Sequence, residues 1–224
     1  MKRIKYTLIL SLSMFFVGNL FSQKQSSGNI TTELQLSPLG SEPLKIDGLK
    51  FRKFLADNKA IRLNMFLGGK KTPTLSTSND IELKSISSNF DLTLKPGYEM
   101  HFNGSNKLSP YIGSELLIGF NNKINSTQTL WGADNSIETK RVKDHSSVLG
   151  LNLFTGTDFY FAEKFYIGVE IGFGFLYNSK GYTSTKYNNP SDPTFTDNKS
   201  KGTSSDFTWG PNYQGTFRIG YCIK

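Results

Sequence analysis

The residues of this 224-residue sequence that could carry out chemistry are its carboxylates, its two histidines and Ser114. Two carboxylates could act together as a general acid and a general base. An ester hydrolase would instead need a serine and a histidine within hydrogen-bond reach. Ser114, His101 and His145 are the candidates for that second scheme. Whether any of these side chains can meet depends on the elements that carry them.

Strict alternation of side chains is the strongest structural signal in the sequence. In FYIGVEIGFGFLY, residues 165–177, the odd-numbered positions are apolar, and the even-numbered positions include three glycines and Glu170. A period of two over such a length indicates a β-strand. Residues 146–161 show the same pattern. Because only Ala162, Glu163 and Lys164 separate the two segments, they are predicted to form a tight hairpin.

The same pattern predicts eight strands, at residues 28–38, 43–55, 59–69, 87–102, 109–122, 146–161, 165–179 and 204–222. The connections ADNK, NGSNKL and AEK are short, whereas residues 70–86, 123–145 and 181–203 are predicted to be long polar loops. All the long connections then lie at one end of the sheet. Outer-membrane barrels have this asymmetry, with short periplasmic turns and longer external loops.

A soluble β-sandwich is the alternative architecture, since it would also bury one face of each strand. Sandwich strands usually have five or six residues, whereas several of these reach about twelve, enough to cross a bilayer at a tilt. An even number of strands also suits a bacterial barrel. We therefore predict an all-β fold, an eight-stranded antiparallel up-and-down transmembrane β-barrel.

Charged side chains fall on the predicted inward face of these strands. An eight-stranded barrel has room in its lumen for side chains and little else, and unpaired charges there would carry a large desolvation cost. We predict that these groups form a structural ion-pair network that closes the lumen. The set comprises Glu33, Lys50, Arg52, Arg62, Asp91, Lys95, Glu99, Glu115, Asp158, Glu170 and Arg218.

The alternation disfavours catalysis. Ser114 is predicted to point outward, His101 points inward near the end of its strand, and His145 lies in a predicted loop, so no histidine shares the surface of Ser114. The sequence has no His/Cys cluster at metal-ligand spacing, and DNSIETKRVKDH lacks the oxygen pattern of a calcium loop. The glycines of GFGFLYNSKG continue a strand and do not open a helix. We predict no enzymatic activity, no metal and no cofactor.

Aromatic residues near the predicted strand ends are assigned to the interfacial girdle of a membrane barrel. They are Tyr111, Tyr160, Tyr166, Trp209 and Tyr213.

The N-terminus has the pattern of a secretory signal. Lys2, Arg3 and Lys5 precede the apolar run YTLILSLSMFFVGNLF, and polar residues follow at once. We expect residues 1–22 to be a signal peptide and residues 23–224 to be a barrel domain in the cell outer membrane. The net charge of +8 is scattered along the chain. Because no basic stripe is formed, nucleic acid is not an expected partner.

With these features the chain resembles the small outer-membrane β-barrel proteins common in Bacteroidetes, which are related in architecture to the OmpA transmembrane domain. The resemblance covers nearly all of the mature chain. Barrels of this kind are similar to porin-family or PorT-like proteins. The resemblance lies in TELQLSPLGSEPLKIDGLKFRKFLADNKAIRLNMFLG, PYIGSELLIGF and GTDFYFAEKFYIGVEIGFGF, and in the signal ending LFSQ. The chain departs from the usual pattern by ending in RIGYCIK and not on an aromatic residue. No domain is expected after the barrel, so peptidoglycan binding of the OmpA kind is not implied.

Barrel and resemblance together imply a non-enzymatic protein with a structural or surface-interaction role. The expected partners are outer-membrane lipids and lipopolysaccharide, and a protein bound through the external loops 123–145 and 181–203. Two alternatives remain open. One is an accessory subunit of an outer-membrane secretion or assembly machine, and the other is a barrel enzyme that modifies lipid A.

Overall fold

The computed structural model describes residues 24–37, 45–131, 136–188, 198–202 and 204–223. Within these ranges all regular secondary structure is β-strand: β1 (Ile30–Ser37), β2 (Lys45–Ala56), β3 (Lys59–Ser78), β4 (Ile81–His101), β5 (Leu108–Trp131), β6 (Ser136–Tyr160), β7 (Phe165–Asn188), β8 (Asn198–Lys201) and β9 (Ser205–Cys222). They contain no helix long and apolar enough to cross a membrane. The signal peptide predicted for residues 1–22 lies outside the described residues.

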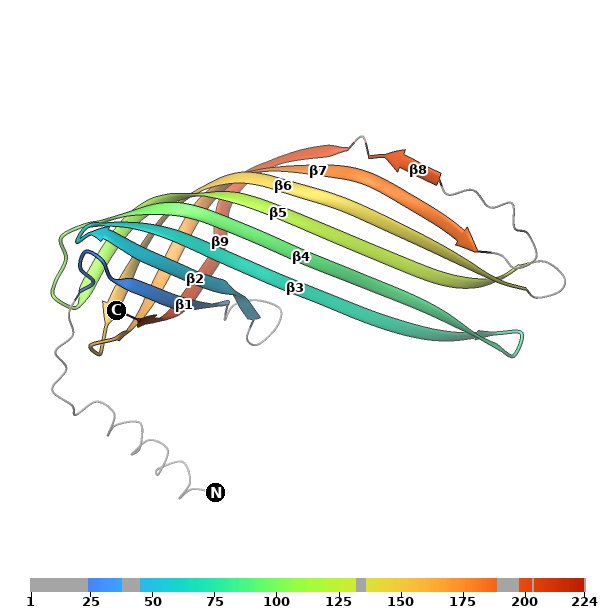
Figure 1. Cartoon of the computed structure of the whole chain (residues 1–224), viewed down its shortest axis with the longest axis horizontal. Coiled ribbons are helices and arrows are strands. Elements are labelled where there is room, and N and C mark those ends of the chain that lie inside the picture. The colour runs from blue at the N-terminus through green and yellow to red at the C-terminus, as the bar shows by residue number, and fades with distance from the viewer. Residues whose placement is uncertain (1–23, 38–44, 132–135, 189–197, 203, 224) are drawn as a thin grey trace, which may run out of the picture.

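Eight of the strands close into an antiparallel ring. Strands β1 to β7 pair in sequence order, β7 pairs with β9, and β9 pairs with β1. The last of these pairings runs from Thr31 opposite Cys222 to Leu36 opposite Phe217. The remaining strand, β8, is four residues long and pairs with β7 beyond the ring (Figure 1). The predicted eight-stranded antiparallel fold is confirmed.

Side-chain alternation explains why the ring forms. Along β7, Tyr166, Gly168 and Glu170 are buried, whereas Phe165 and Val169 are exposed. Successive side chains of a strand point to opposite faces, so one face of each ring strand lines the interior. That interior face is mostly polar and the exterior face is apolar, which is the reverse of a water-soluble protein.

The strands extend much further than the alternation predicted. β3 runs on to Ser78 and β4 starts at Ile81. A two-residue turn, Asn79 and Asp80 at φ of 48° and 59°, joins them. Asn and Asp tolerate this left-handed conformation, and two such residues suit a hairpin of this kind. The loop predicted at residues 70–86 is therefore wrong, since this segment is a continuous hairpin.

The other two predicted loops are also largely strand. β5 and β6 stay paired up to Trp131 opposite Ser136, and β7 continues to Asn188. Within the described residues, the loop predictions for 123–145 and 181–203 are thus wrong. These segments are rich in Thr, Ser, Asn and Lys on both faces. Because both faces meet water, the hydrophobic alternation that marks a half-buried strand disappears.

Strands β3 to β7 carry the sheet beyond the ring as a long curved wall (Figure 1). We call this wall the extension and define it as residues 69–90, 122–131, 136–145, 179–188 and 198–201. On one side it ends at β3, whose pairing with β2 stops at Met65. Lys70, Lys71 and Pro73 lie along that edge. Lysine and proline on an edge strand discourage pairing with another sheet.

Candidate functional site: the barrel interior

Every strand of the ring sends at least one charged side chain into the lumen. Nine of these side chains are buried. They are Glu33 on β1, Lys50 and Arg52 on β2, Arg62 on β3, Glu99 on β4, Glu115 on β5, Asp158 on β6, Glu170 on β7 and Arg218 on β9. We call them the nine-charge network.

Two arginines organise the part of the network nearer the short turns. Arg52 contacts Glu33 at 2.6 Å (Nε to Oε1), Asp158 at 2.8 Å (Nη1 to Oδ2) and Glu99 at 3.0 Å (Nη1 to Oε2). Arg218 contacts Glu33 at 2.9 Å and Asp158 at 2.8 Å, through Nη1 and Nη2. The two guanidinium groups therefore share two carboxylates and tie together β1, β2, β4, β6 and β9.

Arg62 organises the rest. Its Nη1 lies 2.8 Å from Glu99 and 2.8 Å from Glu170, and its Nη2 pairs with Glu115. Glu170 also accepts contacts from Lys50 Nζ at 3.1 Å and from the Tyr111 hydroxyl at 2.8 Å. Because Glu99 contacts both Arg52 and Arg62, the two parts form one continuous network across the barrel axis.

Close approach of the backbone makes room for these long side chains. A Cβ on Gly168 would lie 2.5 Å from Arg218 Nη2 and 2.6 Å from Asp158 Oδ1. The absence of a side chain at this position therefore lets the Arg218–Asp158 pair form directly over β7.

The network contains five carboxylates and four cations. His101 lies at its edge, with Nε2 3.2 Å from Glu99 Oε2 and Nδ1 2.9 Å from Ser109 Oγ. Aromatic rings fill space between the charges. The Arg62 guanidinium carbon lies 3.5 Å from the Phe154 ring centroid, and that of Arg218 lies 5.3 Å from the Tyr111 centroid. Such contacts add attraction between cations and π-faces.

Two of the eleven charged residues predicted for the lumen network do not join it. Asp91 accepts hydrogen bonds from the side-chain amides of Asn89 and Asn121, and neither Asp91 nor Lys95 forms an ion pair with a described residue. Both are half-buried. Asp91 lies opposite Gly68, past the last β3 residue that pairs with β2. Here the described ring is opening into the extension, so these side chains meet more water.

Three tyrosines lie inside the ring and not in the interfacial girdle predicted for them. Tyr111, Tyr160 and Tyr166 were expected in the interfacial girdle, but all three are buried inside the ring. Their positions share the inward parity of Glu115, Asp158 and Glu170, so the alternation itself contained the signal. Of the other two girdle candidates, Trp209 is exposed, and the side chain of Tyr213 lies outside the described residues.

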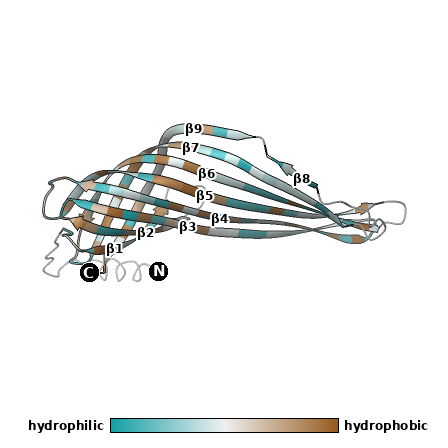
Figure 2. Ribbon diagram, turned by 45° about the horizontal axis from the view of Figure 1, so that its top comes forward, coloured by the Kyte–Doolittle hydropathy of each residue, from teal (hydrophilic) through white to brown (hydrophobic). Residues whose placement is uncertain are grey.

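Hydrophobic positions recur along the ring strands (Figure 2), and the exposed ones give the ring an apolar outer face. We call it the apolar belt. Its exposed members include Leu34, Leu49, Leu63, Leu67, Leu116, Phe120, Leu149, Leu151, Leu153, Val169, Ile171, Phe175, Phe217 and Ile219. Water-soluble monomers rarely expose apolar patches larger than a few hundred Å². A surface of this composition therefore indicates contact with a membrane or with another apolar surface.

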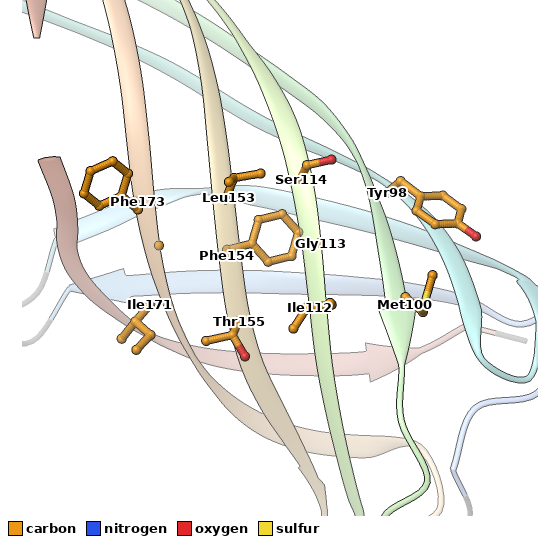
Figure 3. Close-up of a pocket in the computed structure, with 11 residues that line it drawn as sticks. Tyr98, Met100, Ile112, Gly113, Ser114, Leu153, Phe154, Thr155, Ile171 and Phe173 are labelled. Carbon is orange, nitrogen blue, oxygen red and sulfur yellow. The ribbon is translucent and has the colours of Figure 1, made fainter. Parts of the chain in front are cut away.

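Ser114 lies on the outer face, in a shallow apolar depression of about 650 Å³ (Figure 3). Tyr98, Met100, Leu153 and Ile171 are among its lining residues. The described lining contains no histidine, because His101 is buried in the lumen and His145 is exposed on the extension. No serine–histidine pair is assembled at Ser114. The described residues also contain no group of three or more His, Cys, Asp or Glu side chains able to hold a metal ion.

Ring, belt and network define an all-β antiparallel barrel with an apolar exterior and an ionic interior. Neither a scan against protein-family models nor a search of curated proteins gives a match. Among solved structures, the chain is similar to the crystal structure of Acinetobacter baumannii CarO, with 10% sequence identity and a TM-score of 0.37. That similarity covers 89% of this chain and 98% of the CarO chain.

Proposed function

We propose that this chain is an integral outer-membrane β-barrel with a structural or surface-interaction role and no enzymatic activity. The observation that carries the proposal is the inside-out distribution of side chains, with nine buried charges within a ring whose exterior is apolar. A closed ring pairs its backbone groups internally, as a spanning structure must in hydrocarbon. Strands β3 to β7 all exceed the roughly 9–11 residues that a tilted strand needs to cross a bilayer.

The sequence supports export to the outer membrane and a place among the small Bacteroidetes barrels. The N-terminal pattern favours export, and the resemblance to small Bacteroidetes outer-membrane barrels supports a place in that group. In this arrangement the short turns at residues 57–58 and 161–164 face the periplasm. The extension stands outside the cell, where it is the surface available to a partner.

The proposed barrel has a lumen that is closed to ions. We expect the purified protein to show no stable single-channel conductance in a planar bilayer, because the network links all eight strands across the axis and small barrels fill their lumen with side chains. Recording over a range of voltages in symmetrical salt tests this. Large, stable current steps from the unmodified protein would show an open pore and contradict the proposal.

Orientation has its own test. We expect Ser78→Cys, near the tip of the β3–β4 hairpin, to react with a membrane-impermeant maleimide on intact cells. Glu163→Cys, in the turn between β6 and β7, should react only after the outer membrane is permeabilised. Both positions are exposed, and the native Cys222 is buried and so contributes little background. The reverse labelling pattern would place the extension in the periplasm.

A further inference from the structure

We propose that the outer face of the extension binds the phosphorylated headgroup of an outer-leaflet glycolipid, in a hollow lined by Lys71, Arg141 and Lys186. This inference rests on the proposed function, because it requires the apolar belt to lie in the bilayer and the extension to stand directly outside it. It adds a ligand class and a binding site to the barrel.

The register shows which residues share the outer face of the extension. Directly paired residues lie on the same face of a sheet. Lys71 pairs with Ser88, Ser88 with Ile124, and Ile124 with Lys143. On β3, the exposed belt residue Leu67 lies four residues before Lys71, and on β5 the exposed belt residue Phe120 lies four residues before Ile124. Side chains an even number of residues apart on a strand point to the same face, so both belt residues share this face. The outer face of the extension is therefore a continuation of the apolar belt.

Charge is distributed unequally between the two faces. The outer face carries seven basic residues and one acid: Lys71, Lys84, Arg141, Lys143, Lys186, Lys199 and Lys201, with Glu82. The inner face carries four basic residues and two acids: Lys70, Lys123, Lys140 and Lys180, with Glu138 and Asp144. Both faces meet water, so solubility alone does not explain the excess on one of them. An anionic partner on the outer face does.

A hollow on this face brings cations of three strands together. It has a volume of about 700 Å³ and is lined by Lys71 of β3, Arg141 of β6 and Lys186 of β7, with Ile86 and Ile124 between them. Arg141 lies directly opposite Lys186 in the β6–β7 register. Within the described part of the chain no carboxylate pairs with Lys71 or Arg141, so these two cations are available to a bound anion.

The height of the hollow selects a lipid headgroup as that anion. Leu67, Leu92 and Phe120 form one paired row of apolar side chains, and Lys71 follows Leu67 by four residues. At about 3.3 Å per residue and a tilt near 45°, the hollow begins roughly 9 Å above that row. The polar headgroup region starts at the edge of the hydrocarbon and extends several Å outward. Phosphates there can reach the cations while acyl chains contact the belt.

The test uses the full-length mature protein folded in detergent, with diphosphorylated lipid A in mixed micelles as the probe. The triple variant Lys71→Gln, Arg141→Gln, Lys186→Gln should bind the probe about 100-fold more weakly than the unmodified protein, since each basic residue near an anionic lipid surface contributes about fivefold. The control variant Lys70→Gln, Lys123→Gln, Lys180→Gln removes the same charge from the inner face of the extension, on β3, β5 and β7. It should bind as the unmodified protein does.

Lipid A with both phosphates removed completes the design. The unmodified protein should bind it as weakly as the outer-face variant binds the diphosphorylated probe. Equal losses in the two triple variants would overturn the proposal in favour of a general charge effect, and so would equal affinity for the two lipids. Insertion into phosphatidylcholine vesicles is measured first on each protein. Failure to insert would count against the barrel proposal, whereas insertion without lipid preference would overturn this inference alone.

Discussion

Replacing Arg62 with methionine is expected to lower the free energy of unfolding by about 3–5 kcal/mol, the usual effect of removing one partner from a buried ionic cluster. Arg62 contacts Glu99, Glu115 and Glu170 at once. The network already has one more carboxylate than it has cations, so the substitution leaves three buried carboxylates competing for fewer partners. Among the described residues, Glu115 would keep only the hydrogen bond from the Asn152 side-chain amide, at 3.1 Å.

Denaturant titration of the protein refolded in phospholipid vesicles measures this effect. Glu170→Gln should cost clearly less than Arg62→Met, because Arg62 keeps Glu99 at 2.8 Å and Lys50 keeps Glu33 at 3.8 Å. Lys180→Met, at an exposed position of the extension, should change the stability by no more than about 0.5 kcal/mol. If Arg62→Met were tolerated as well as Lys180→Met, the network would not contribute to stability.

Val169→Arg is expected to destabilise the barrel by about 2–4 kcal/mol, as a charge on the lipid face does near the bilayer midplane. Val169 is 52% exposed on β7 and lies between Thr157 of β6 and Phe217 of β9. In water this exposed position would accept arginine easily, so the cost arises from hydrocarbon and not from packing.

The same vesicle titration gives the comparison. Thr74→Arg, on the exposed β3 part of the extension, should be neutral to within about 0.5 kcal/mol. In detergent micelles, which let water reach the protein surface more easily, the penalty at Val169 should shrink. Equal stability of the two variants in vesicles would contradict the assignment of the apolar belt to the membrane.

The ring could be predicted from the sequence because its strands separate two very different solvents. Val169 and Ile171 alternate with Gly168 and Glu170, so the pattern itself reports which face meets which environment. The same parity places the nine residues of the network, and also Asp91 and Lys95, on the inward face of their strands. Their specific pairing could not be predicted, because it depends on how far each strand is shifted against its neighbours around the whole ring.

The two wrong predictions, the long loops and the tyrosines of the girdle, also have physical causes. In the extension both faces meet water, so Thr74 and Lys71 carry no hydrophobic period, and a paired strand looks like a loop. The prediction for the three tyrosines was wrong for another reason. Tyr111 has an apolar ring and a polar hydroxyl, which suits both a membrane interface and an ionic lumen. Only its parity, and not its residue type, distinguishes the two environments.

The joint between β1 and β9 has a consequence for the lifetime of the protein. It brings together residues far apart in the chain, such as Glu33 and Arg218, which are 185 positions apart, while most other ring pairings join consecutive strands. Contacts of such long range require the costliest loop closure, and we infer that they form late in folding. Interactions absent from the transition state govern unfolding more than folding. We therefore expect the Glu33–Arg218 pair to slow the unfolding of the folded barrel more than it speeds folding.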